Sequence, residues 1–158
     1  MNDVFTHETA IIESEDIGEG TKIWAFSHVS KNAKIGKNCI IGEGVYIGPN
    51  VTIGDRCKIQ NRATIYEGLH IGNDVFIGPF VVTTNDIFPD MYDKNWEKRF
   101  RETHIKDGAS VGANSTIVCG ITLHKKCMIG AGSVVTKDVN ENTLVFGNPA
   151  SFRKYLDR

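Results

Sequence analysis

Residues 35–77 carry an isoleucine at every sixth position, and this period constrains the fold more than any other feature of the chain. The eight isoleucines are Ile35, Ile41, Ile47, Ile53, Ile59, Ile65, Ile71 and Ile77. Glycine follows most of them, and a small or apolar residue stands two positions before each one. The period extends back through Val29, Ile23, Ile17 and Ile11 to Phe5, and it resumes at Ile105, Val111, Ile117, Leu123, Ile129 and Val135. Such a regular repeat defines the architecture of most of the chain.

A six-residue period fits a short strand followed by a bend. An α-helix of 3.6 residues per turn would spread these isoleucines around its whole circumference. On a strand, residues two apart share a face, so each repeat aliphatic and the residue two before it point the same way. The Gly, Asn and Asp residues that follow tolerate positive φ and therefore supply the bend. Repetition winds the chain into an all-β coil with flat sides, in which each turn buries its apolar residues against its neighbours.

Three strands per turn place residues eighteen apart in one stack, and the position before each repeat aliphatic points outward. One predicted outer stack contains His28, Tyr46, Thr64 and Val82; a second contains Lys22, Ile40, Lys58 and Phe76; a third contains Lys34, Thr52 and His70. Outward Ile40, Tyr46, Phe76 and Met128 are apolar. Exposed apolar patches are typical of subunit contacts, and closed rotational symmetry is the usual outcome.

The period fails after Val82 and returns only at Ile105. We divide the single domain 1–158 into N-terminal coils (1–83), an inserted loop (84–104), C-terminal coils (105–139) and a C-terminal cap (140–158). The loop mixes aromatic residues with both signs of charge, which favours a segment that folds over a ligand or a neighbouring subunit. In the cap, Asn148 and Pro149 are followed by Phe152, Tyr155 and Leu156 at helical spacing, which predicts a short C-terminal helix.

Composition excludes several classes of function. The net charge is −1 without a basic stripe, so nucleic acid is not an expected partner. No apolar run reaches the roughly 18 residues of a membrane span, and the N-terminus does not read as a signal peptide, so we expect a cytoplasmic protein without a membrane partner. Cys39, Cys57 and Cys127 occupy small inward positions and are expected in the core, whereas Cys119 lies outside that position. We expect neither a disulfide nor a metal site.

The pattern resembles the left-handed parallel β-helix of hexapeptide-repeat acyltransferases, and the left hand is taken from that resemblance. The segments VTTND, GASVGANSTIVCGITL, IGAGSVVTKDV and GNPA are similar to those of the N-acetyltransferases that modify nucleotide-linked 3-amino sugars. The resemblance implies acetyl-CoA as the co-substrate, a UDP- or dTDP-linked 3-amino sugar as the acceptor, a role in O-antigen, capsule or S-layer glycan assembly, and a homotrimer. Both nucleotides are compatible with the motifs, and so are acyl groups other than acetyl.

The resemblance also implies catalytic positions. Thr84 and Asn85 match a Thr-Asn pair that precedes the inserted loop in the family, where the Asn contacts the sugar amine. The carbonyl of the Asn85 side chain can accept an N–H hydrogen bond and orient the amine, but it cannot act as a base. Asp86 could accept a proton, although an intrinsic pKa near about 4 makes it a weak base. The stack that contains His28 leads towards Val82 and the loop, so His28 is one alternative base. His104 at the end of the loop and His124 at a bend remain further candidates, and no single histidine dominates. Several members of the family work without a side-chain base, so Asn85 ranks first.

Further positions are predicted to bind the two substrates. The Gly-Ala bends let backbone approach CoA closely, while basic residues near the C-terminus can meet its phosphates. These positions are Gly112, Ala113, Gly130, Ala131, Lys137, and Arg153 or Lys154. Gln60, Asn61 and Arg62 interrupt the repeat where glycine is expected, and they are predicted to hold the nucleotide. The same glycines also serve simply to form bends, and Gln60–Arg62 also fit an ordinary solvated bend.

Three other functions are compatible with a coil of this kind. One is a sugar O-acetyltransferase of the same fold, although the TND motif is more similar to the amine-specific group. Another is a non-catalytic β-helix binding protein. The third is a zinc enzyme similar to the hexapeptide-coil carbonic anhydrases, which require closely spaced histidines. The five histidines here, His7, His28, His70, His104 and His124, are never closer than 20 residues in sequence.

Overall fold

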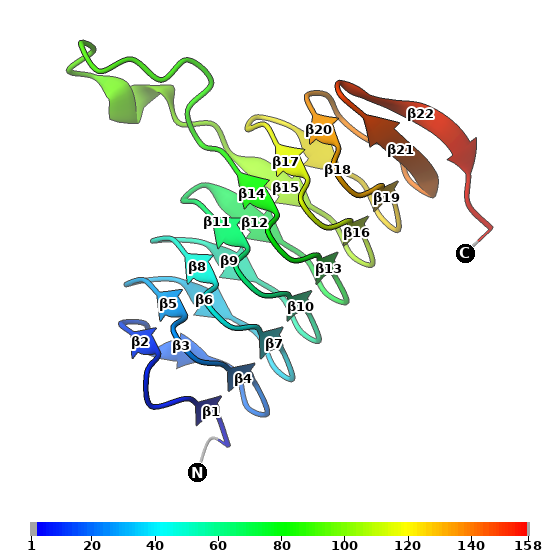
Figure 1. Ribbon diagram of the computed structural model, residues 1–158. Helices are drawn as coiled ribbons and strands as arrows, with labels where there is room; N and C mark the ends of the chain where they lie inside the picture. The colour runs from blue at the N-terminus through cyan, green and yellow to red at the C-terminus, as the bar shows by residue number, and fades with distance from the viewer. Residues whose placement is uncertain (1–2, 158) are drawn as a thin grey trace.

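The computed structural model describes residues 3–157, and it shows a prism of short strands with the two ends of the chain at opposite ends of the coil (Figure 1). The fold is the left-handed parallel β-helix predicted from the repeat. A loop of residues 84–102 projects sideways from the prism within the fifth turn of the coil, where the aliphatic period is interrupted (Figure 1). Over residues 3–157 no helix is long and apolar enough to cross a membrane.

Three sheets form the three faces of the prism. Face 1 contains β1 (Phe5–Thr6), β4 (Lys22–Ile23), β7 (Ile40–Ile41), β10 (Lys58–Ile59), β13 (Phe76–Ile77), β16 (Ser110–Val111), β19 (Met128–Ile129), β21 (Thr143–Gly147) and β22 (Ala150–Tyr155). Face 2 contains β2 (Ile11–Ile12), β5 (His28–Val29), β8 (Tyr46–Ile47), β11 (Thr64–Ile65), β14 (Val82–Thr83), β17 (Thr116–Ile117) and β20 (Val134–Val135). Face 3 contains β3 (Asp16–Ile17), β6 (Lys34–Ile35), β9 (Thr52–Ile53), β12 (Leu69–Ile71), β15 (Thr103–Ile105) and β18 (Thr122–Leu123).

The strand register confirms the predicted outer stacks. On face 1, Lys58 pairs with Ile40 on one side and Phe76 on the other. On face 2, Tyr46 lies between His28 and Thr64. The repeat aliphatics point inward and are buried throughout the coil from Ile23 to Val135. The eighteen-residue turn read from the sequence is therefore the turn of the solenoid.

The first turn departs from the predicted period by one residue. Phe5 pairs with Lys22, and Ile11 pairs with His28, so both residues lie on outward positions and are 44% and 58% exposed. The inward positions belong instead to Thr6 and Ile12. Because side chains alternate along a strand, a shift of one residue moves the whole set to the opposite face. Ile17 follows Ile12 by five positions in place of the usual six, and this shorter step produces the shift.

The predicted C-terminal helix is wrong. β21 continues the parallel ladder of face 1 by pairing with β19, and the chain then turns back through Asn148 and Pro149 into β22, which pairs antiparallel with β21. The free edge of β19 offers backbone hydrogen bonds that outweigh local helix signals. Phe152 and Tyr155 are 54% and 75% exposed, so their helical spacing did not mark a buried face.

The insertion is slightly shorter than predicted. β14 ends at Thr83 and β15 begins at Thr103, so Thr103 and His104 belong to the coil and the loop proper comprises residues 84–102. Its one regular element is the 3₁₀-helix η1 (Trp96–Arg99). Cys39, Cys57 and Cys127 are buried in the core, as predicted, and Cys119 is buried as well.

Candidate active site

The Thr84–Asn85 pair lies at the base of the inserted loop, on the corner between faces 2 and 3 (corner 2–3). Thr84 is fixed by its backbone N–H, which donates to the carbonyl of Ile117 at 3.0 Å, and by its hydroxyl oxygen, which accepts from the N–H of Cys119 at 3.0 Å. The carbonyl of Asn85 accepts from the N–H of Arg101 at 2.9 Å. Thr84 is thus held by the coil, and the backbone carbonyl of Asn85 is held by the returning end of the loop.

The Asn85 side chain makes no hydrogen bond within residues 3–157 and is only half-buried. Its amide offers one carbonyl acceptor and two N–H donors. Because polar groups without a protein partner need water or a ligand, this amide is available to a bound substrate. The Asn85 amide, which is predicted to orient the amine, is therefore accessible to a ligand and is attached to a fixed backbone.

Asp86 is committed to an ion pair inside the loop. The Arg99 guanidinium donates to both of its carboxylate oxygens, with Nη2 at 2.7 Å from Oδ2 and Nε at 3.1 Å from each oxygen. These hydrogen bonds from Arg99 hold the pKa of Asp86 below its ordinary value. A carboxylate with a lowered pKa is a weaker proton acceptor than a free one, so Asp86 is better suited to anchoring the loop than to acting as a base.

The outer part of the loop presents aromatic and apolar side chains to solvent. Phe88, Met91 and Tyr92 are 73%, 97% and 94% exposed, whereas the rings of Trp96 and Phe100 pack at 5.4 Å. A cavity of about 450 Å³ lies within the loop, between Met91 and Trp96. This arrangement fits a loop that covers a ligand or a second chain, because exposed apolar groups gain free energy when they are covered.

A second cavity, of about 270 Å³, lies beside the loop base on face 3. Its lining residues are Asn50, Glu67, Gly68, His70, Phe100, Arg101 and Glu102. The ring of His70 stacks on that of His104 at 5.0 Å, and burial, followed by the charge of Lys106, lowers the pKa of His104. Sequence reasoning ended this outer stack at His70 and therefore missed the cluster. The insertion hides the relationship, because His70 and His104 share a column although they are 34 residues apart.

His28 lies far from Asn85 within one chain. It sits on β5, and Val82 of β14 lies three steps further along the stack of face 2. At about 4.8 Å per tier this is about 14 Å. Its Nε2 atom is 3.1 Å from a carboxylate oxygen of Glu13, and its ring packs edge-on against Tyr46. The fold therefore does not bring His28 and Asn85 together in a single protomer.

The Gly-Ala bends that are predicted to bind CoA share the corner between faces 1 and 2 (corner 1–2). A Cβ atom added to Gly112 would lie 2.5 Å from the backbone nitrogen of Ala131, so the close stacking of tiers requires glycine there. A Cβ added to Gly132 would meet no atom within 4 Å, which leaves an open backbone surface beside it. Arg153 lies near this corner, with its guanidinium 4.1 Å from the centre of the Phe146 ring. Ala113 and Gly130 lie on the same corner. A Cβ atom added to Gly130 would meet the side chain of Phe146.

Gln60, Asn61 and Arg62 also lie on corner 1–2, closer to the N-terminus. The side-chain oxygen of Asn61 accepts from the backbone N–H of Glu43 at 3.0 Å, so that side chain stabilises the stacking of tiers. Arg62 extends into solvent near Glu43, at 3.7 Å. Face 2 separates this bend from Asn85. The predicted substrate residues are thus divided between two corners of one chain.

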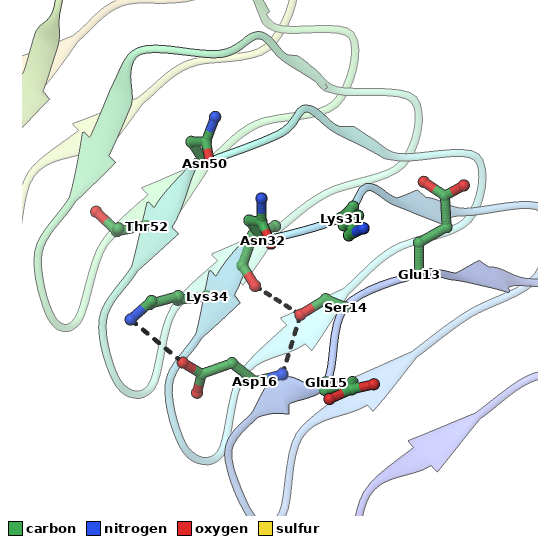
Figure 2. A pocket seen from close by; sticks show the side chains of 10 residues that line it. Glu13, Ser14, Glu15, Asp16, Lys31, Asn32, Lys34, Asn50 and Thr52 are labelled. Atoms are coloured by element: carbon green, nitrogen blue, oxygen red, sulfur yellow. Dashed lines mark hydrogen bonds and ion pairs between the residues drawn. The ribbon is translucent and has the colours of Figure 1, made fainter.

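Two other regions of corner 2–3 lie away from Asn85, towards the two ends of the coil. Lys137 is exposed on corner 2–3 near the C-terminal end and borders a cavity of about 280 Å³ beside β22. A cavity of about 630 Å³ lies on corner 2–3 near the N-terminus (Figure 2). There the hydroxyl of Ser14 donates to the carbonyl of Ala33 at 2.5 Å, and Lys34 lies 3.6 Å from Asp16. No group of three His, Cys, Asp or Glu side chains that could hold a metal ion occurs in residues 3–157.

The chain belongs to the bacterial transferase hexapeptide family, whose six-repeat profile matches residues 16–49, 50–85 and 102–137. The matched ranges stop at Asn85 and resume at Glu102, so they exclude the inserted loop.

Individual relatives are named as acetyltransferases or as an N-acyltransferase. A dTDP-3-amino-3,6-dideoxy-α-D-galactopyranose 3-N-acetyltransferase of Aneurinibacillus thermoaerophilus is 43% identical over 152 residues, which cover 96% of this chain and 78% of that protein. A hexapeptide-repeat acetyltransferase of Vibrio cholerae, solved with acetyl coenzyme A, is 26% identical, with a TM-score of 0.60 over 75% of this chain and 71% of that one. An N-acyltransferase of Bacillus cereus, solved with dTDP-4-amino-4,6-dideoxyglucose and coenzyme A, is 18% identical and has a TM-score of 0.65 over 99% of this chain and 82% of that one; it shows the shared fold.

Proposed function

We propose that this protein is an N-acetyltransferase that moves the acetyl group of acetyl-CoA to the 3-amino group of a dTDP-linked 3-amino-3,6-dideoxyhexose. The observation that carries the proposal is the 43% identity over 96% of the chain to an enzyme named for that reaction. The unpaired Asn85 amide at the loop base supports it from the structure. The product would serve surface-glycan assembly, as O-antigen, capsule or S-layer, in the cytoplasm.

The reaction requires the sugar amine to be free and held against the thioester. Its nitrogen forms a bond to the thioester carbon, the carbon–sulfur bond breaks, and the amine proton passes to the departing thiolate. The Asn85 carbonyl would accept an N–H hydrogen bond and aim the nitrogen lone pair, and such positioning can supply several kcal/mol of the barrier. Thr84 would hold Asn85 through its own contacts to the next tier. Asp86 would anchor the loop, since its ion pair with Arg99 leaves it a weak base.

We further propose that the working unit is a homotrimer with sites between subunits. Within one chain, Asn85 lies on corner 2–3 while Gln60–Arg62, Gly112–Ala113 and Gly130–Ala131 lie on corner 1–2. A site that uses both sets needs the corner of one subunit to face the loop base of the next. Exposed Phe26, Ile40, Phe76 and Phe80 on and beside corner 1–2 support such a contact. Arg153 and Lys137 would lie at the rim, within reach of CoA phosphates. Light scattering should give about three times the 17.5 kDa chain mass, and a monomer at micromolar concentration would contradict the trimer.

The substrate class is tested by thiol release from acetyl-CoA with a panel of UDP- and dTDP-linked amino sugars. We expect turnover with a dTDP-linked 3-amino-3,6-dideoxyhexose and much slower turnover with UDP-linked sugars. A matched 3-hydroxy sugar is the control, because an O-acetyltransferase would acetylate it. Acetylation of the hydroxy sugar alone, or no thiol release with any sugar, would overturn the proposal.

The role of Asn85 is tested by three variants. Asn85→Ala should lower kcat by about 10²-fold, equivalent to about 3 kcal/mol of lost positioning, while the Kd for CoA changes little. Asn85→Asp keeps the shape but adds a negative charge, which favours the unreactive ammonium form of the amine, so it should also be impaired. His28→Asn should have a smaller effect than Asn85→Ala. If His28→Asn abolished turnover at every pH while Asn85→Ala stayed near wild type, the base would be histidine.

A further inference from the structure

Arg99 joins two distant parts of the inserted loop. Its guanidinium donates to both carboxylate oxygens of Asp86, and its Nη1 atom pairs closely with the carboxylate of Asp93. The side chains of Arg99, Asp86 and Asp93 are 20%, 13% and 33% exposed, so the pairs are largely shielded from solvent. A planar guanidinium that binds a carboxylate through two parallel bonds fixes direction as well as distance.

The Arg99–Asp86 pair closes the loop at its base. Asp86 and Phe100 face each other as an antiparallel bridge, and the N–H of Arg101 donates to the carbonyl of Asn85 at 2.9 Å. The outgoing and returning ends of the loop therefore lie side by side, and they are joined by a backbone hydrogen bond and by the Arg99–Asp86 ion pair. Asp86 also accepts from the N–H of Phe88 at 2.9 Å, which fixes the direction in which the loop leaves.

The Asn85 side chain depends on this closure for its direction. Thr84 on one side is fixed by the next tier, and Asp86 on the other is fixed by Arg99. Between them, the Asn85 amide has no hydrogen bond of its own among the described residues. The orientation of this amide is therefore set by the backbone on either side of Asn85. We infer that Arg99 is a positioning residue that acts through Asp86 to aim the Asn85 amide at the substrate amine.

This inference rests on the proposed function of Asn85, and a double-mutant cycle separates the two. Arg99→Ala in the otherwise unchanged chain should lower kcat about tenfold or more, while the KM for acetyl-CoA stays within twofold. In the Asn85→Ala background, the same Arg99→Ala change should lower kcat by less than twofold, because the group that Arg99 aims is already gone. Arg99→Lys keeps the charge but loses the two-pronged geometry, so its loss of kcat should be intermediate.

Asp93→Asn is the matched control. It releases the far part of the loop but leaves the Arg99–Asp86 pair in place, so kcat should fall less than threefold even if the KM for the sugar rises. An equal loss of kcat in Asp93→Asn and Arg99→Ala would mean that Arg99 acts only by ordering the loop, and would overturn the inference.

Each remaining outcome also decides the question. If Arg99→Ala lowers kcat by the same factor with and without Asn85, Arg99 acts independently and only the inference fails. If Asn85→Ala keeps wild-type turnover, the assignment of Asn85 fails and the inference fails with it. Because Arg99 lies outside the coil, Arg99→Ala should keep the wild-type Tm; should it not fold, Arg99→Lys supports the same comparison.

Discussion

Removal of the inserted loop tests the separation between fold and substrate recognition. Asp86 and Phe100 already face each other as an antiparallel bridge, so residues 87–99 can be replaced by the two-residue turn Asn-Gly without moving either end. The contacts of Arg99 and the Asx-type bonds of Asp90 and Asp93 all lie within the loop, so their loss leaves the coil unchanged. Each tier of the coil packs only against the tiers beside it.

The expected change in stability follows from chain entropy. Closing a loop loses entropy in proportion to the logarithm of its length, about 0.6 kcal/mol for each doubling. Shortening thirteen residues to two should therefore stabilise the fold by about 1.5 kcal/mol, which corresponds to a rise in Tm of a few degrees. By contrast, Ile59 is fully buried between Ile41 and Ile77, and Ile59→Asp should destabilise by more than about 4 kcal/mol.

Thermal unfolding, CoA binding and sugar acetylation are measured on the same loop-deleted protein. We expect an unchanged or raised Tm, CoA binding within about threefold of wild type, and loss of acetyl transfer to the sugar. A fall in Tm as large as that of Ile59→Asp would show that the loop holds the coil together and would refute the reasoning. Full activity without the loop would refute its role in substrate binding.

Three further predictions concern register, tier stacking and protonation. Ile12→Asp should lower Tm far more than Ile11→Asp, since only Ile12 points inward in the shifted first turn; equal effects would contradict that register. Gly112→Ala should destabilise by about 1–3 kcal/mol, measured by denaturant unfolding, because the new methyl group meets the backbone of Ala131. The pKa of His104, followed by NMR, should lie below its ordinary 6.5 because burial disfavours the imidazolium. The unfolded chain then binds the proton more readily, so the contribution of His104 to stability should fall as the pH drops below about 6.5, and His104→Gln should remove that component.

Much of the candidate site could be located from the sequence because it follows the repeat. The loss of period after Val82 marked the loop, and the resemblance placed Thr84 and Asn85 at its base. The engagement of Asp86 by Arg99 could not be predicted, because it depends on how an irregular segment folds back on itself. The stacked pair of His70 and His104 was hidden for a related reason, since the loop displaces the eighteen-residue column.

The sequence by itself determined the coil. A buried aliphatic every six residues, with bend-forming residues between, leaves one way to bury the apolar side chains, and each tier repeats the local solution of the one before it. The tertiary structure decided what the period does not encode. It set the one-residue shift of the first turn, and it formed the C-terminal hairpin, where the open edge of β19 recruits a strand in place of the predicted helix. It also showed that Asn85 and the Gly-Ala bends lie on different corners. These features depend on contacts between segments distant in sequence, whose free energies outweigh local preference.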